Sequence, residues 1–131
     1  MKDRINGVIK KRESFRPFAP AVTKERQHDY FLMGGDVPYM NQVVPVRPAY
    51  RDELLAVTHI DGSARVQTVY KGTVFHNLLK EFEKLTGYPI LLNTSFNVKD
   101  KTMVLTPQDA LKTFYETELD ILVLNNYIVY K

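Results

Sequence analysis

Cysteine is absent from this 131-residue sequence, and so is any apolar run long enough to cross a bilayer. The first absence excludes disulfide bonds and cysteine-rich zinc sites, and it agrees with a reducing compartment. The second leaves no candidate membrane span. The charged first residues are followed by no apolar segment of the signal-peptide kind. We therefore expect a cytoplasmic protein with no membrane partner.

Several sequence patterns that mark an active site are also missing. Neither a P-loop nor the glycine pattern of dinucleotide-binding proteins occurs, so side chains would have to hold the phosphates of any bound nucleotide. No serine has an identifiable base beside it, which removes the argument for a nucleophilic triad. His59 and Asp61 are two potential metal ligands without a defined third, so we assign no metal site.

The composition that remains is that of an ordinary globular domain. Hydrophobic residues make up 44% of the chain and charged residues 25%, which supports a packed core. The length predicts a single domain spanning residues 1–131. A net charge of +3 and a pI near 9.1 suit an anionic ligand, but they are weak evidence for nucleic acid.

Positive charge is concentrated at the start of the chain. A phosphate-binding patch and a solvated charged face are both consistent with this run, and the sequence leaves the choice open. Within Met1–Arg16, Asp3 and Glu13 are the acidic residues. The cations of the same stretch are Lys2, Arg4, Lys10, Lys11, Arg12 and Arg16.

The first half of the chain predicts short elements between loops. Met1–Lys11 is expected to be the end of a helix, because its apolar residues share one helical face. The two prolines in Phe15–Val22 exclude a regular helix and favour extended chain or an edge strand. Thr23–Phe31 is expected to be a short helix capped by Thr23. Further extended segments are expected at Val43–Arg47, Leu54–Ile60 and Ala64–Val69.

The second half gives clearer signals. Val74–Leu85 has apolar residues at helical spacing, with Thr73 as a cap and Gly87 as a stop. Thr106 and Pro107 mark the start of another helix. Strands are expected at Ile90–Leu92, Thr102–Leu105, Ile121–Leu124 and Tyr127–Tyr130. Together these elements predict an α+β fold with a mixed, mainly antiparallel sheet.

One stretch combines a buried strand with polar side chains. Ile90–Asn97 reads I-L-L-N-T-S-F-N, so an apolar run ends in small hydrogen-bonding residues. Ser95 and Asn97 are two positions apart, and continued strand geometry would point them to the same side. A hydroxyl and an amide on one face can hold a phosphate or a nucleotide. A simple polar turn after a core strand is the alternative interpretation.

Four stretches of the sequence resemble the C-terminal domain of the NodU/CmcH-type O-carbamoyltransferases. They are K-D-R-I-N…K-K-R-E-S-F-R-P-F-A-P-A-V (2–22), V-T-H-I-D-G-S-A-R-V-Q-T-V (57–69), T-G-Y-P-I-L-L-N-T-S-F-N-V-K (86–99) and T-P-Q-D-A-L-K-T-F (106–114). Their order and spacing also agree with that family. The resemblance covers essentially the whole chain.

The resemblance implies a fold and a reaction. The fold would be YrdC-like, with a twisted, mainly antiparallel sheet and helices. Such a domain would use ATP, carried with Mg²⁺, and carbamoyl phosphate to form carbamoyl-adenylate and pyrophosphate. A separate N-terminal domain would then pass the carbamoyl group to an acceptor hydroxyl. The chemistry fits a chain without a nucleophile, because phosphoryl chemistry of this kind can proceed by positioning and charge stabilisation.

The resemblance also assigns roles to residues. Lys10, Arg16 and Arg65 would be the catalytic cations, each holding the phosphates of the substrates. Ser95 and Asn97 match an S-x-N motif that contacts phosphate and ribose in YrdC-like domains. The other expected contacts to ATP or carbamoyl phosphate are Lys11, Arg12 and His59.

The sequence departs from the family pattern in two places. The family's arginine-rich G-P-R-A-L-G-N-R-S segment is not present, so we expect an N-terminally truncated domain that needs a transfer domain on the same or another chain. Asp100–Val104 stands where the family usually has G-E-P-I-V. Two alternative functions remain at this point: a basic nucleic-acid-binding module of YrdC-like fold, and an inactive interaction domain. Nucleic acid is the less favoured partner.

Overall fold

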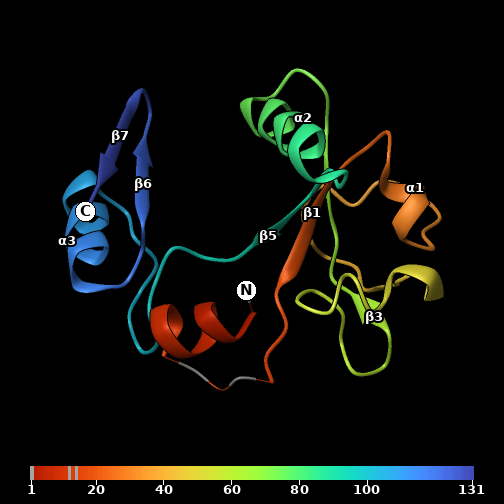
Figure 1. Cartoon of the computed structure of the whole chain (residues 1–131), viewed down its shortest axis with the longest axis horizontal. Coiled ribbons are helices and arrows are strands. Elements are labelled where there is room, and N and C mark those ends of the chain that lie inside the picture. The colour runs from red at the N-terminus through yellow and green to blue at the C-terminus, as the bar shows by residue number, and fades with distance from the viewer. Residues whose placement is uncertain (1, 12, 14) are drawn as a thin grey trace. The chain divides into compact units, whose positions relative to one another are not determined.

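The computed structural model describes residues 2–11, 13 and 15–131. The chain divides into two compact units, shown in Figure 1. The terminal unit consists of Met1–Arg16 with Ser95–Lys131, and the central unit is Pro17–Thr94. Each unit contains both helices and strands, which confirms the α+β class. Within the described residues, no helix has the length and apolar character needed to cross a membrane.

The central unit is built on a three-stranded mixed sheet with the order β4-β1-β5. Strand β1 (Ala19–Thr23) pairs in parallel with β4 (Gln67–Val69) and antiparallel with β5 (Ile90–Asn93). The extended chain expected here is confirmed, but β1 lies between two strands and all five of its residues are buried, so the edge position is wrong. Pro20 is tolerated because it precedes the first registered pair with β4, and that ladder does not need its amide hydrogen.

Helix α2 (Val74–Thr86) covers one part of this sheet. Leu79 is fully buried and packs with Ala21 of β1 and Val69 of β4. The predicted boundaries are confirmed: the Thr73 hydroxyl accepts a hydrogen bond from the His76 amide at 3.0 Å, and the helix ends at Gly87, whose φ is +83°.

The remaining elements of the central unit are short. Strands β2 (Val44–Pro45) and β3 (Ser63–Ala64) form an antiparallel pair. Helix α1 (Gln27–Tyr30) is shorter than expected, and Arg26 occupies its N-cap position. The prediction that Thr23 caps this helix is wrong, because pairing with Val69 keeps Thr23 in β1. The 3₁₀-helix η2 spans Pro48–Tyr50.

The expected extended segment Leu54–Ile60 is wrong. The backbone instead forms consecutive turns, in which the Leu54 amide donates to the Tyr50 carbonyl at 2.9 Å and the Thr58 amide to the Leu54 carbonyl at 3.0 Å. Leu54 and Val57 are both buried, which is helical rather than strand spacing. Leu54 and Val57 therefore face the interior from the same side of these turns.

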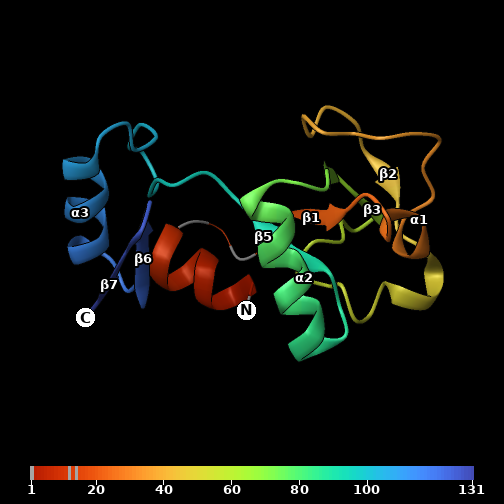
Figure 2. The same cartoon turned by 90° about the horizontal axis from the view of Figure 1, so that it is seen from above.

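The terminal unit contains a π-helix, η1 (Arg4–Lys10), and helix α3 (Pro107–Glu116) beside a hairpin of β6 (Ile121–Leu124) and β7 (Tyr127–Tyr130). Figures 1 and 2 both show α3 along the hairpin. The core of this contact is Ala110 and Phe114 of α3 against Leu122 of β6. The predicted helix after Thr106 and the hairpin are confirmed. A helix is also present near the start of the chain, but its buried residues are Asn6 and Lys10, and Val8 of the expected apolar face is exposed.

The predicted strand Thr102–Leu105 is wrong. In the described part of the chain this segment has no strand partner, and it runs as a loop. The Val104 amide donates to the Phe96 carbonyl at 3.0 Å, which folds the loop back onto its own beginning. Alternating side chains without a neighbouring strand do not form a ladder.

Candidate functional site

Three predicted site residues meet in the terminal unit, and we call them the Lys10 cluster: Lys10, Ser95 and Asn97. Lys10 ends η1, and its side chain is buried, with 5% of the residue's surface exposed. Its ammonium group donates to Asn97 Oδ1 at 3.0 Å, to Ser95 Oγ at 3.4 Å and to the Ser95 carbonyl oxygen. Segments 85 residues apart in sequence thus place a cation, a hydroxyl and an amide together.

Ser95 and Asn97 are aligned by direct contact rather than by strand geometry. Strand β5 ends at Asn93, before either residue. The Ser95 hydroxyl donates to Asn97 Oδ1 at 2.6 Å, and Asn97 Nδ2 donates to the Lys101 carbonyl at 3.0 Å. Ser95 is exposed, so the cluster presents its hydroxyl to solvent.

Charged groups continue around this cluster. The Lys99 amide donates to the Lys10 carbonyl at 3.1 Å, while the Lys99 ammonium lies 3.6 Å from a Glu13 carboxylate oxygen. The other Glu13 oxygen lies 3.8 Å from the Arg16 guanidinium. Hydrogen bonding to its own backbone and the charge of Lys99 lower the pKa of Glu13. Sequence reasoning missed Lys99 and Glu13, because only the fold brings them beside the cluster.

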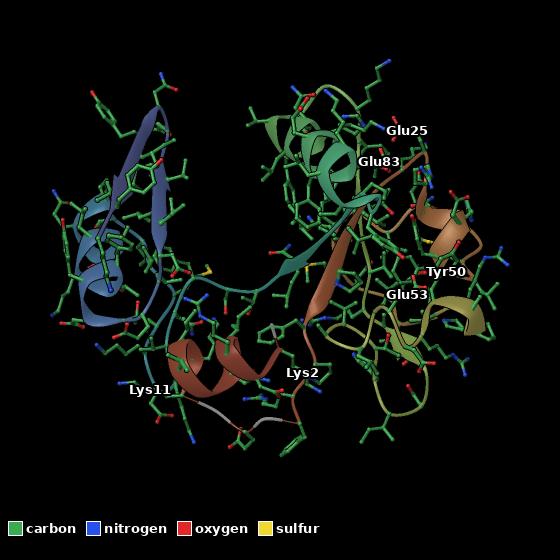
Figure 3. The ribbon with its side chains drawn as sticks, viewed as in Figure 1. Lys2, Lys11, Glu25, Tyr50, Glu53 and Glu83 are labelled. Carbon is green, nitrogen blue, oxygen red and sulfur yellow. The ribbon has the colours of Figure 1, made fainter. Side chains whose placement is uncertain are left out.

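The other predicted cations of the terminal unit are less constrained. Arg16 is exposed. Lys11 is also exposed and has a left-handed φ of 53°, which ends η1 (Figure 3). Arg12 lies outside the described residues. In this unit the structure therefore brings Lys10, rather than Lys11 or Arg16, into contact with Ser95 and Asn97.

His59 and Arg65 belong to the central unit. The His59 amide donates to the Ser63 carbonyl at 2.7 Å, and its Nδ1 lies 3.3 Å from Ser63 Oγ. Asp61 accepts hydrogen bonds from the Ser63 hydroxyl at 2.6 Å and the Ser63 amide at 3.0 Å, and these bonds lower its pKa. These contacts form the His59–Ser63 turn. Arg65 follows it and is exposed.

Among the described residues, no group of three or more histidine, aspartate or glutamate side chains is placed to hold an ion. The pair His59 and Asp61 takes part in the turn described above.

The Lys10 cluster has the chemistry of an anion site. An ammonium group provides a point charge, while hydroxyl and amide groups provide directed hydrogen bonds. Hydrogen bonds to a charged partner are shorter and stronger than those between neutral groups. Such a set suits the oxygens of a phosphate.

Comparison with known proteins identifies the family. The model of the family described as carbamoyltransferase C-terminus matches residues 1–131. This chain belongs to that family. It is 47% identical over 135 residues to nodulation protein NolNO of Sinorhizobium fredii, which covers 99% of this chain and 20% of that protein. The resemblance found in the sequence is thus confirmed.

Two other relatives are also much longer than this chain. The chain is 47% identical over 135 residues to nodulation protein NolO of Bradyrhizobium diazoefficiens, covering 99% of this chain and 25% of that protein. It is 46% identical over 100 residues to nodulation protein U of Rhizobium tropici, covering 75% of this chain and 17% of that protein. The chain therefore spans a quarter or less of each of these proteins.

Proposed function

We propose that this chain is the carbamoyl-adenylate-forming part of a carbamoyltransferase and that it binds ATP and carbamoyl phosphate. The observation that carries the proposal is the Lys10 cluster, in which an ammonium, a hydroxyl and an amide converge. Membership of the carbamoyltransferase C-terminal family supports the choice of substrates. The YrdC-like form of the fold is part of the same proposal.

The proposed reaction consumes ATP, carbamoyl phosphate and water. Water bonds to the carbamoyl carbon, the bond between that carbon and the phosphate oxygen breaks, and carbamate and inorganic phosphate form. A carbamate oxygen then bonds to the α-phosphorus of ATP, the bond between the α-phosphorus and its bridging oxygen to the β-phosphate breaks, and pyrophosphate leaves. Transfer of the carbamoyl group from the adenylate to an acceptor hydroxyl is assigned to a separate N-terminal domain.

The protein's part in this reaction is to bind and hold anions. Two polyanions must approach each other, so fixed positive charge lowers their repulsion and stabilises the charge of the transition state. Lys10 supplies that charge, and Ser95 and Asn97 orient phosphate oxygens. An incoming oxygen can accept the hydrogen bond that Ser95 Oγ now accepts from Lys10 at 3.4 Å.

The other predicted site residues have secondary roles in this proposal. Arg16 is exposed, and we assign it to outer phosphate oxygens beside the Lys10 cluster. Arg65 is exposed on the central unit and stays a predicted phosphate contact. Lys11, Arg12 and His59 remain predicted contacts. Mg²⁺ would arrive on the phosphates of ATP and screen their charge, since the described residues contain no acidic cluster for it.

Calorimetric titration of the 131-residue chain tests the proposal. We expect ATP with Mg²⁺ and carbamoyl phosphate each to bind, and Lys10→Ala and Asn97→Ala to weaken both. Because Lys10 is buried, its loss also affects folding, so Ser95→Asp provides a second test at an exposed position. The new carboxylate would occupy the place of a phosphate beside Lys10 and repel the ligand.

Two exposed positions on the central unit provide controls. Lys71→Ala removes an exposed lysine, and Asn77→Ala removes an exposed amide. Both should bind like the parent. A folded parent that binds neither ATP nor carbamoyl phosphate would contradict the proposal, and so would a Ser95→Asp variant that binds as well as the parent.

A further inference from the structure

A tight turn follows Asn97, and it consists of Val98, Lys99, Asp100 and Lys101; we call it the 98–101 turn. The Lys101 amide donates to the Val98 carbonyl at 3.3 Å, which closes the turn. Asp100, at the third position, has a φ of 62°. A type II turn requires a positive φ at this position and favours glycine or asparagine there. The turn therefore depends on a residue that tolerates the left-handed region.

The 98–101 turn holds one end of the Asn97 side chain. The Lys101 carbonyl accepts a hydrogen bond from Asn97 Nδ2 at 3.0 Å. At the other end of the same carboxamide, Oδ1 accepts from the Lys10 ammonium at 3.0 Å and from the Ser95 hydroxyl at 2.6 Å. An ammonium group can only donate hydrogen bonds, so a reversed carboxamide would set one donor against another. The turn and Lys10 thus fix one orientation of the Asn97 amide.

The same turn is tied to the helix that carries Lys10. The Lys99 amide donates to the Lys10 carbonyl at 3.1 Å, and all of these residues belong to the terminal unit. The Lys101 carbonyl lies one residue beyond Asp100, so its direction depends on the backbone angles of Asp100. The Asp100 side chain is exposed and does not fill space in the unit. The backbone conformation of Asp100 therefore controls whether the Lys101 carbonyl reaches Asn97.

We propose that Asp100 is a positioning residue, whose left-handed backbone conformation fixes the Asn97 amide for phosphate binding. This inference rests on the proposed function, because it takes Asn97 as a phosphate contact. The bond to the Lys101 carbonyl uses one of the two Nδ2 hydrogens, and it fixes the direction of the other, which donates to the ligand. A side chain that is ordered before binding loses less entropy when the ligand arrives.

A substitution series at Asp100 tests this role by titration calorimetry with carbamoyl phosphate. Asp100→Val should weaken binding by about fivefold, because a β-branched residue does not tolerate the left-handed region and the turn would release Asn97. Asp100→Asn and Asp100→Gly should bind within about twofold of the parent, since both residues adopt this conformation. Asp100→Asn also removes the carboxylate charge, so it separates the effect of charge from that of the backbone.

A double-mutant cycle shows whether Asp100 acts through Asn97. In the Asn97→Ala background, Asp100→Val should cause no further loss of affinity, because the side chain that the turn positions is absent. A general disturbance of the terminal unit would instead weaken binding by the same factor in both backgrounds. The cycle therefore distinguishes a positioning role from a merely structural one.

Asn125 provides a matched control in the same unit. It lies in the turn between β6 and β7, is exposed, and has a φ of 52°. Asn125→Val should lower the melting temperature by a few degrees, as Asp100→Val should, yet it should bind carbamoyl phosphate like the parent. Asp100→Ala carries a smaller backbone penalty and takes the place of Asp100→Val if that variant does not fold.

Three results would overturn the positioning role while leaving the phosphate site in place. They are an Asp100→Val variant that binds like the parent, an Asp100→Asn variant that binds as weakly as Asp100→Val, and an equal loss of affinity in the Asn97→Ala background. If the folded parent binds neither ATP nor carbamoyl phosphate, the proposed function fails and this inference fails with it.

Discussion

Lys10 and Arg65 are both expected to bind phosphate, yet their surroundings differ in the two units. Lys10 is buried, and its ammonium is fixed by Ser95 and Asn97. Arg65 follows the His59–Ser63 turn and is exposed. Folding has already restricted the Lys10 side chain, whereas Arg65 must lose up to about 2 kcal/mol of rotamer entropy when it binds. The comparison indicates that a preorganised cation contributes more to affinity than a mobile one.

The largest expected effect is at the preorganised cation. Lys10→Ala should weaken ATP binding by about 100-fold, because it removes charged hydrogen bonds that need no further ordering. Titration calorimetry with Lys71→Ala as the matched control measures this effect. Thermal unfolding of both variants shows that the protein is folded at the titration temperature. If Lys10→Ala weakens ATP binding by less than about threefold, Lys10 does not contribute more to affinity than Arg65.

The second effect concerns the backbone that positions the segment before Arg65. Gly62 has a φ of +79°, and a Cβ there would lie 2.6 Å from Arg51 Cζ. Gly62→Ala should therefore lower the free energy of unfolding by about 1–3 kcal/mol, measured by chemical denaturation.

Two other glycines provide a graded control for that substitution. Gly72 has a φ of +89° with open space around it, and Gly35 has open space without a positive φ. Gly72→Ala should lower the free energy of unfolding by less than Gly62→Ala does, and Gly35→Ala should leave it nearly unchanged. Equal effects at Gly62 and Gly35 would show that the turn does not constrain this segment.

A smaller effect is expected for the mobile cation. Arg65→Ala should weaken ATP binding by about fivefold, since most of its attraction is offset by screening and ordering. Titration calorimetry measures the change. Arg65→Lys should recover most of it if charge alone matters. A loss of affinity as large as that of Lys10→Ala would mean that Arg65 is fixed in the bound state. Its exposure in the free chain would then not predict its contribution to affinity.

The smallest effect is the pH response of the His59–Ser63 turn. Hydrogen bonds from Ser63 lower the pKa of Asp61 in the folded chain. The stabilisation is therefore present above the unfolded-state pKa of about 3.9 and is lost as the pH falls through the lower folded-state value. Asp61→Asn should flatten the acid side of a plot of unfolding midpoint against pH. An unchanged acid side would show that these hydrogen bonds do not favour the ionised carboxylate.

Local signals in the sequence predicted the elements that depend on local interactions. Helix α2 begins after Thr73 and ends before Gly87, as the cap and stop residues indicate. Helix α3 begins at a capping box formed by Thr106 and Asp109. In both cases the side chain and the backbone groups it satisfies lie within one turn, so the sequence contains the necessary information.

Features that depend on distant partners could not be predicted in the same way. The position of β1 in the middle of its sheet follows from its pairing with β4 and β5, and Pro20 gave the opposite signal. Thr102–Leu105 has strand-forming residues but no neighbouring strand among the described residues. The approach of Lys10 to Ser95 spans 85 residues, and no periodic pattern encodes it. The resemblance to a family selected both residues, but not their contact.

The most direct test of the central claim is an NMR titration of the isotopically labelled chain with carbamoyl phosphate and then with ATP and Mg²⁺. We expect the backbone amide signals of Ser95, Asn97 and Lys99 to shift with the first additions and to saturate together. In Ser95→Asp, the amide signals of Asn97 and Lys99 should not shift when the ligands are added. Saturable shifts confined to residues outside the Lys10 cluster, with Ser95, Asn97 and Lys99 unchanged, would contradict the account.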